Sequence, residues 1–177
     1  QKAFVIKEAR GSTGVPQAKQ LQGKELSYNN FLDSEAALLC LHEFKDSSCV
    51  IVKHGSPCGI GFGKTTRTAF LGALRVDPLS AFGGVVAINK ECDLATAKEL
   101  NKVFFEVVIA PAFDRDALAF FSKKKNLRIL LLKKHKPRRV VVRDISGGRI
   151  AQETDLSTLK MGGLKTATRR KPTKTQL

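Results

Sequence analysis

The sequence predicts an α/β protein with layered αβα architecture, in which helices cover a mostly parallel sheet. Short apolar runs, such as residues 50–52 and 85–88, are bounded by Gly, Pro or charged residues, as is typical of buried strands. Between these runs, apolar side chains recur every three or four positions, as they do on one face of a helix. Because such strands and helices alternate along the chain, a largely parallel sheet is expected.

Residues that can cap a first turn mark where the expected helices begin. They are Asp33 or Ser34, Thr65 or Thr66, Asp93, and Asp114. The sequence thus predicts helices at residues 33–44, 65–75, 94–102 and 114–121, and strands at residues 3–6, 50–52, 85–88, 105–110, 127–132, 140–142 and 150–151. Residues 11–24, rich in Gly, Ser, Pro and Gln, are expected to form a loop, and residues 146–148 a turn.

The formal net charge of +15 is concentrated in the last third of the chain. Residues 123–177 hold 17 Lys and Arg against 3 Asp and Glu, a net of +14, whereas residues 1–122 hold 14 against 13, a net of +1. A basic segment can bind nucleic acid or an anionic ligand. The last aromatic residue is Phe121, so the segment has no rings on which bases could stack, and nucleic-acid binding is not expected.

Composition also restricts the cellular setting. No apolar run is long enough to cross a membrane, and the chain does not start like a signal peptide. The cytoplasm is the default compartment, and a plastid location would require a presequence. Since the sequence starts at Gln1 rather than Met and ends in a basic segment, it is expected to be a fragment of a longer protein or a processed chain. The four cysteines form no C-x-x-C pair, which argues against a disulfide framework or a zinc ribbon.

The strongest chemical signal lies where the apolar run of residues 50–52 ends at Lys53 and His54. Ligands of open α/β sheets bind at the carboxyl ends of strands, so both side chains are expected at a ligand-facing edge. A neutral imidazole can accept a proton at neutral pH, and an ammonium group can stabilise an oxyanion. The pair therefore indicates metal-free proton transfer, with a chance Lys-His pair in an ordinary loop as the alternative.

Two other chemistries fit less well. Residues 59–65 end like a phosphate-binding Gly-Lys-Thr loop, but Cys58 stands where that motif needs its first glycine. His54 and the following Pro-Cys pair echo a zinc deaminase signature, but Ser56 and Gly61 occupy the positions of its Glu and second Cys. Three zinc ligands cannot be assembled from these residues, so no metal is expected.

A series of short motifs follows along the chain. They are QGKELSYNN at 22–30, KHGSPCG at 53–59, DPLSAFGG at 77–84, EVVIAP at 106–111, KKKNLR at 123–128, SGG at 146–148 and TRRKPT at 168–173. In this order they resemble the AICAR transformylase domain of bifunctional purine biosynthesis proteins, AICAR being 5-aminoimidazole-4-carboxamide ribonucleotide. The resemblance implies a cytidine-deaminase-like α/β fold without zinc. Residues 1–154 would be the first half of this domain, and residues 155–177 a basic segment leading to its second half.

The resemblance also implies an activity in purine (IMP) biosynthesis. The reaction is formyl transfer from the co-substrate 10-formyltetrahydrofolate to the 5-amino group of AICAR, in a protein that is also an IMP cyclohydrolase and a homodimer. Lys53 and His54 match the catalytic pair of the family, and His54 and Gly147 match positions that bind AICAR. Of a family segment that includes Arg-Tyr-Gly, this sequence contains only the last residue, Gln1. Residues 1–177 alone are therefore not expected to form a complete site.

Two rival functions remain open at this point. The chain could be a catalytically inactive relative that binds only a purine nucleotide or a protein partner. It could also be a nucleic-acid-binding module that uses residues 123–177, although the missing aromatic residues argue against this.

Overall fold

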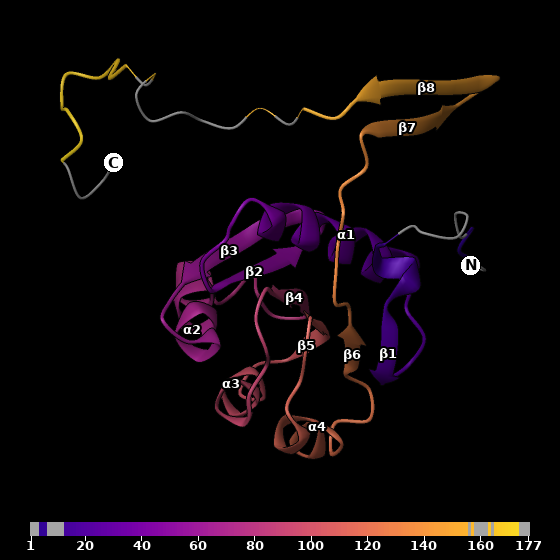
Figure 1. The fold of residues 1–177 in the computed structure, drawn as a ribbon, viewed down its shortest axis with the longest axis vertical. Helices are drawn as coiled ribbons and strands as arrows, with labels where there is room; N and C mark the ends of the chain where they lie inside the picture. Colours follow the sequence, from indigo (N-terminus) through magenta and orange to yellow (C-terminus); the bar gives the residue numbers. More distant parts are fainter. Residues whose placement is uncertain (1–3, 7–12, 156, 158–162, 164, 174–177) are drawn as a thin grey trace. The chain divides into compact units, whose positions relative to one another are not determined.

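The computed structural model describes residues 4–6, 13–155, 157, 163 and 165–173. The chain forms two compact units, Gln1–Pro137 and Arg138–Leu177, each of which is described by itself. A six-stranded sheet organises the first unit, and a two-stranded sheet forms the second (Figure 1).

The sheet of the first unit is mixed, with four of its six strands pointing the same way. From one edge to the other, its strands are β1 (Lys19–Gln22), β6 (Arg128–Leu131), β5 (Phe105–Ala110), β4 (Gly84–Ile88), β2 (Ser48–Lys53) and β3 (Ser56–Phe62). β4, β5 and β6 pair in parallel, whereas β2 is antiparallel to β3 and β4, and β1 is antiparallel to β6. By strand direction the sheet is mostly parallel, as expected, and β1 and β2 are its reversed strands.

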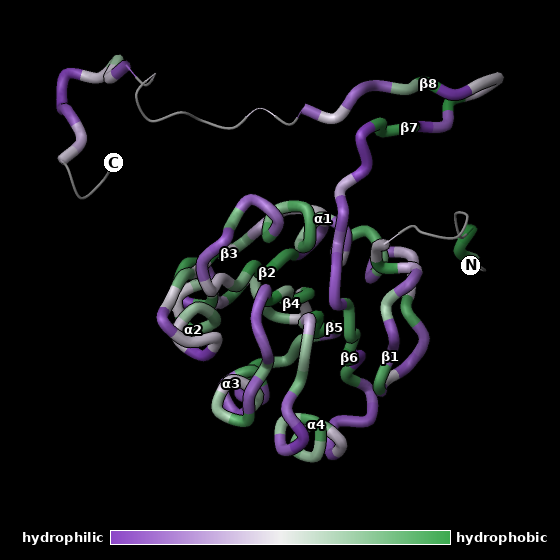
Figure 2. Tube along the Cα trace, viewed as in Figure 1, coloured by the Kyte–Doolittle hydropathy of each residue, from purple (hydrophilic) through white to green (hydrophobic). Residues whose placement is uncertain are grey.

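Helices cover both faces of this sheet because successive strand residues point to opposite sides. On one face, α1 (Tyr28–His42) packs on alternate residues of the central strands, namely Val50, Val52, Val85, Ala87, Val107 and Ile109. On the other face, α2 (Thr66–Val76), α3 (Leu94–Leu100) and α4 (Arg115–Phe121) pack on the intervening residues, namely Cys49, Ile51, Val86, Ile88, Val108 and Ala110. Figure 2 shows the corresponding hydrophobic colouring of β4 and β5.

Most expected elements between residues 48 and 131 are present, and their caps act as expected. Thr65, Asp93 and Asp114 are the N-cap residues of α2, α3 and α4, and each side chain accepts a hydrogen bond from the backbone N–H three residues on. Such a cap satisfies one of the backbone donors that the first helical turn leaves free. Local sequence therefore determines where these helices begin.

Two expectations near the start of the chain are wrong. Residues 4–6 form no strand and are exposed, while residue 3 lies outside the described residues. The expected loop at 11–24 contains a 3-10 helix, η1 (Val15–Gln17), and the edge strand β1. β1 reads Lys-Gln-Leu-Gln, so it lacks the apolar alternation that reveals a strand. Its position depends on distant partners, because the Gln22 amide donates hydrogen bonds of 3.1–3.2 Å to three carbonyl groups around α4 and the following loop.

The first helix begins one and a half turns earlier than expected. Ser27, not Asp33 or Ser34, is its N-cap, because the Ser27 hydroxyl accepts from the Asn30 N–H while the Asn30 side chain accepts from the Ser27 N–H. This reciprocal pair is a capping box. Asp33 consequently lies within α1, where its carboxylate is available for another partner.

β3 includes the first glycines of the stretch that resembles a phosphate-binding loop. A Cβ atom built on Gly59, Gly61 or Gly63 would overlap atoms of α2 or of its first turn. These glycines alternate along the chain and so lie on one face of the strand, directly against the helix. Close packing of α2 on β3 therefore explains the glycines that resembled a phosphate-binding loop.

The second unit contains one antiparallel hairpin. β7 (Val140–Ile145) and β8 (Gly148–Glu153) are longer than the expected strands at 140–142 and 150–151, and all their residues are exposed. Ser146 and Gly147 form the turn, as expected, and Gly147 has a φ of 82°. The expected domain boundary after residue 154 remains a prediction. The two compact units meet between residues 137 and 138, but a compact unit need not coincide with a domain of the family.

Candidate functional site

The Lys53–His54 pair lies at the tip of the β2–β3 hairpin. Lys53 pairs with Ser56 across the hairpin, so His54 and Gly55 form a two-residue turn. Their φ angles are 55° and 76°, and positive φ at both positions is typical of a type I′ turn. His54 is the only non-glycine residue with positive φ among the described residues, and its side chain is exposed. Histidine is one of the few residue types that tolerate this region of backbone space.

A side chain from α1 fixes this turn. Asp33 Oδ1 accepts a hydrogen bond from the Gly55 backbone N–H at 2.7 Å. This carboxylate was expected to cap a helix, but the Ser27 cap leaves it free to hold the backbone beside His54. No motif in the sequence links residues 33 and 55, so only the fold reveals this contact.

The Lys53 ammonium is anchored on the loop before β4. Lys53 Nζ donates a hydrogen bond of 2.7 Å to the carbonyl oxygen of Gly83, and the side chain is half-buried. Gly83 has a φ of 70°, and its own N–H donates to the Phe104 carbonyl at 2.7 Å. An ammonium group carries three N–H donors, so two remain for another partner. A cation with two available donors thus stands beside the turn that carries His54.

The edge of the sheet at which this pair lies differs from the expected one. β2 runs antiparallel to β4, so the end of β2 lies beside Gly84 at the start of β4. Phe105 and Arg128 begin β5 and β6 at the same edge. The pair is therefore at the carboxyl end of its own strand but at the amino-terminal edge of the parallel strands, because the direction of β2 is reversed.

Several of the sequence motifs meet at this amino-terminal edge. The loop from Gly23 to Ser27 is held there by Arg128, whose Nε donates to the Glu25 carbonyl at 2.9 Å. The Asn30 amide donates to Glu106 at 2.6 Å. Motifs at 22–30, 53–59, 77–84, 106–111 and 123–128 thus contribute residues to one side of the first unit.

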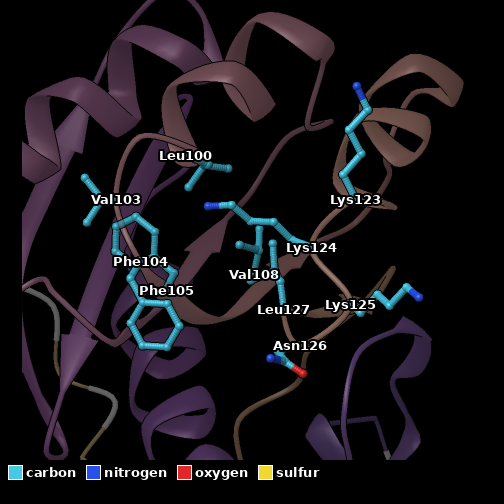
Figure 3. Close-up of a pocket in the computed structure, with 10 residues that line it drawn as sticks. All are labelled: Leu100, Val103, Phe104, Phe105, Val108, Lys123, Lys124, Lys125, Asn126 and Leu127. Atoms are coloured by element: carbon cyan, nitrogen blue, oxygen red, sulfur yellow. The ribbon is translucent and has the colours of Figure 1, made fainter.

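A cavity of about 450 Å³ opens at the same edge. Its lining comes from the end of α3, the start of β5 and residues 123–127, which precede β6 (Figure 3). Phe104 belongs to this lining and also accepts the hydrogen bond from Gly83. Gly83 therefore contacts both the anchored Lys53 and one wall of the cavity.

Gly147 belongs to the second unit, whereas Lys53 and His54 belong to the first. Gly147 lies in the hairpin turn of the second unit, and a Cβ built on it would meet no atom within 4 Å. Its expected role in substrate binding therefore remains a prediction.

Among the described residues, neither of the two weaker chemistries has the arrangement of groups that it needs. Gly59 and Gly61 are strand residues packed on α2 rather than a loop around a phosphate. No group of three or more His, Cys, Asp or Glu side chains among the described residues could hold a metal ion. The Cys58 Sγ lies 3.5 Å from the Ile51 carbonyl, and burial raises the pKa of this thiol, which favours its neutral form.

Within the described part of the chain, no helix has the length and apolarity to cross a membrane.

Comparison with known proteins decides the family. A sequence model of the AICARFT/IMPCHase bienzyme matches residues 1–177. The chain belongs to the AICARFT/IMPCHase bienzyme family. This membership confirms the resemblance carried by the motifs.

Two bacterial relatives illustrate this membership. The bifunctional purine biosynthesis protein PurH of Halalkalibacterium halodurans is 44% identical over 179 residues, which cover 99% of this chain and 35% of the relative. PurH of Lacticaseibacillus casei is 45% identical over 180 residues, covering 100% of this chain and 36% of the relative. The chain thus spans about a third of the length of the curated relatives it matches. Among solved structures, Acinetobacter baumannii RibD in form 1 aligns with 49% of this chain and 28% of that chain at 20% identity, and its TM-score of 0.41 is too low to support an argument.

Proposed function

We propose that this chain contributes the Lys53–His54 catalytic pair to an AICAR formyltransferase that uses 10-formyltetrahydrofolate. The observation that supports this most is that an anchored ammonium and an exposed imidazole adjoin at one hairpin tip, in a member of a family named for AICARFT. Neither side chain is sealed in the hydrophobic core, since Lys53 is half-buried and His54 is exposed. Both can therefore reach a substrate.

The chemistry needs a base and an oxyanion donor. The AICAR amine is a weak nucleophile because its lone pair delocalises toward the carboxamide. As the amine nitrogen bonds to the formyl carbon, His54 takes the amine proton and the formyl oxygen becomes an oxyanion. Lys53, with two free N–H donors, stabilises this oxyanion. When the oxyanion collapses, the bond from the formyl carbon to N10 of tetrahydrofolate breaks, and N10 takes up the proton.

The rest of the site has to come from elsewhere. In this proposal His54 and Gly147 are each AICAR-binding residues, and residues outside this chain complete the folate pocket and the homodimer. The proposal also includes a zinc-free cytidine-deaminase-like fold, which the helices on both faces of the sheet support. We also propose that the longer protein carries an IMP cyclohydrolase activity, in keeping with the bifunctional relatives. Its proposed location is the cytoplasm.

The direct experiment follows tetrahydrofolate release when the full-length protein is given AICAR and 10-formyltetrahydrofolate. Transfer is expected, and Lys53→Met should lower turnover by about 100-fold because one oxyanion donor is lost. Lys64→Met is the matched control, since Lys64 is an exposed lysine beyond the hairpin. Saturable AICAR binding without any transfer would instead support a binding protein that has no catalytic activity.

A further inference from the structure

The cavity at the amino-terminal edge of β5 and β6 has no part in the proposed formyl transfer. Its volume of about 450 Å³ is within the range of small-molecule sites in proteins. The cavity lies between α3 and residues 123–127, and no residue of the Lys53–His54 hairpin lines it. A ligand bound in this cavity would therefore not contact the hairpin that carries His54.

The walls of the cavity are apolar and include two aromatic rings. Leu100, Phe105, Val108 and Leu127 are buried lining residues that belong to the core under α3 and α4. Phe104 lies at the mouth, with 49% of its surface exposed. Aromatic rings pack well edge-to-face or offset against another planar ring. The walls therefore favour a flat, apolar group.

One of three successive lysines turns its charge toward the cavity. Figure 3 shows Lys124 reaching toward Leu100 and Phe104, whereas Lys123 and Lys125 extend outward. Lys124 is half-buried, and both neighbouring lysines are exposed. Among the ten lining residues there is no Asp or Glu to neutralise this ammonium.

The Lys124 ammonium still has donors to offer. Its Nζ donates one hydrogen bond, of 2.8 Å, to the Asn101 carbonyl at the end of α3, which leaves two N–H groups. Because the ammonium stands beside apolar walls, its attraction for an anion is screened less than it would be in bulk water. A carboxylate is an anion of suitable size to accept both remaining N–H groups.

We propose that this cavity is a binding site for a planar aromatic carboxylate. The ring lies against Phe104 and Leu127, and the carboxylate accepts hydrogen bonds from Lys124. Lys123 and Lys125 add only a diffuse positive field, because their side chains point to solvent. This binding does not depend on the proposed formyl transfer.

The test uses 2-naphthoate as the probe, titrated into the full chain by calorimetry. Saturable binding is expected with a Kd of about 1 mM or tighter. Lys124→Met should weaken it about tenfold, because a charge-assisted hydrogen bond is lost, whereas Lys123→Met and Lys125→Met should each change it less than about threefold. The neutral probe 2-naphthamide should bind about tenfold more weakly than 2-naphthoate.

Three results would overturn the proposal: no saturable binding, equal weakening by all three lysine variants, or equal affinity for naphthoate and naphthamide. Lys124 also holds the end of α3, so thermal unfolding of each variant is measured alongside. If Lys124→Met does not fold, Val103→Phe replaces it, since Val103 lines the cavity and the larger ring narrows it. That variant should weaken the binding of 2-naphthoate, and unchanged binding refutes the site.

Discussion

Lys53 Nζ donates a 2.7 Å hydrogen bond to the carbonyl oxygen of Gly83, thirty residues along the chain. Gly83 is buried and has a φ of 70°, a conformation that glycine adopts without strain. The contact joins the end of β2 to the loop before β4 and fixes the position of the ammonium. The proposed catalytic cation thus depends on a backbone shape that few other residues could provide.

Gly83→Ala is expected to lower both stability and formyl transfer. The left-handed φ costs about 1–2 kcal/mol with any Cβ, and the new atom would stand 3.0 Å from Lys53 Nζ. Gly55→Ala is the matched control for stability, because its φ of 76° is similar and its Cβ would meet no atom within 4 Å. Chemical denaturation should show a larger decrease in the free energy of unfolding for Gly83→Ala than for Gly55→Ala. Equal decreases would argue against a tight contact between residue 83 and Lys53.

Asp33 is expected to act as a positioning residue for His54. Asp33→Ala removes the acceptor for the Gly55 N–H, so the hairpin turn loosens and turnover should fall by about tenfold or more, as small displacements of reacting groups are costly. Asp33→Asn keeps an oxygen acceptor and should retain most of the activity. The free energy of unfolding should change by only about 1 kcal/mol in Asp33→Ala. If Asn and Ala reduced turnover equally, the hydrogen bond would not be the cause.

The packing of α2 on β3 predicts a selective effect of glycine substitution. Gly61→Ala should destabilise the chain by about 1–3 kcal/mol, because its Cβ would overlap the backbone of α2. Gly14→Ala is the control, since its Cβ would meet only ordinary contacts at 3.6 and 3.7 Å. Urea denaturation measures both variants, and similar stability of the two would contradict the close approach of helix and strand.

Glu99 is expected to give part of the stability a dependence on pH. Hydrogen bonds from Lys102 and then Arg67, with N–O distances of 2.6 and 2.8 Å, lower the pKa of this carboxyl, whose side chain is 10% exposed. A carboxyl whose pKa is lower in the folded state than in the unfolded state, where it is about 4.3, stabilises the fold at pH values above the unfolded-state pKa. This contribution is lost as the pH falls through the pKa of the folded state.

The difference in unfolding free energy between wild type and Glu99→Gln should accordingly shrink as the pH is lowered from about 6 to about 3. Denaturation curves at several pH values measure this difference. A difference that stayed constant over the whole range would show that the ion pairs do not lower the pKa.

Much of the central fold could be predicted because its signals are local. Strands such as β4 and β5 are continuous apolar runs, and Thr65, Asp93 and Asp114 cap the helices that follow them. β1 could not be found, because its four residues carry almost no apolar pattern and are held by partners about a hundred residues away. β3 was missed because its glycines, which serve helix packing, look like a loop.

The candidate site was predictable only in part. Lys53 and His54 stood out because charged residues ended an apolar run, and they do lie at a strand end. The edge of the sheet that they occupy depends on the direction of β2. This direction is set by antiparallel pairing with β4, which cannot be predicted from the residues of β2 alone. The contacts of Asp33 and Gly83 with this hairpin could not be predicted for the same reason, since only the fold brings these residues to it.

The most direct measurement is single-turnover formyl transfer by the full-length protein with His54→Ala, compared with His42→Ala. His42 is also exposed, but it lies in the last turn of α1. If His54 is the base, His54→Ala should slow transfer by about 100-fold or more while His42→Ala leaves it unchanged. Undiminished transfer by a folded His54→Ala variant would contradict the proposed role of this hairpin.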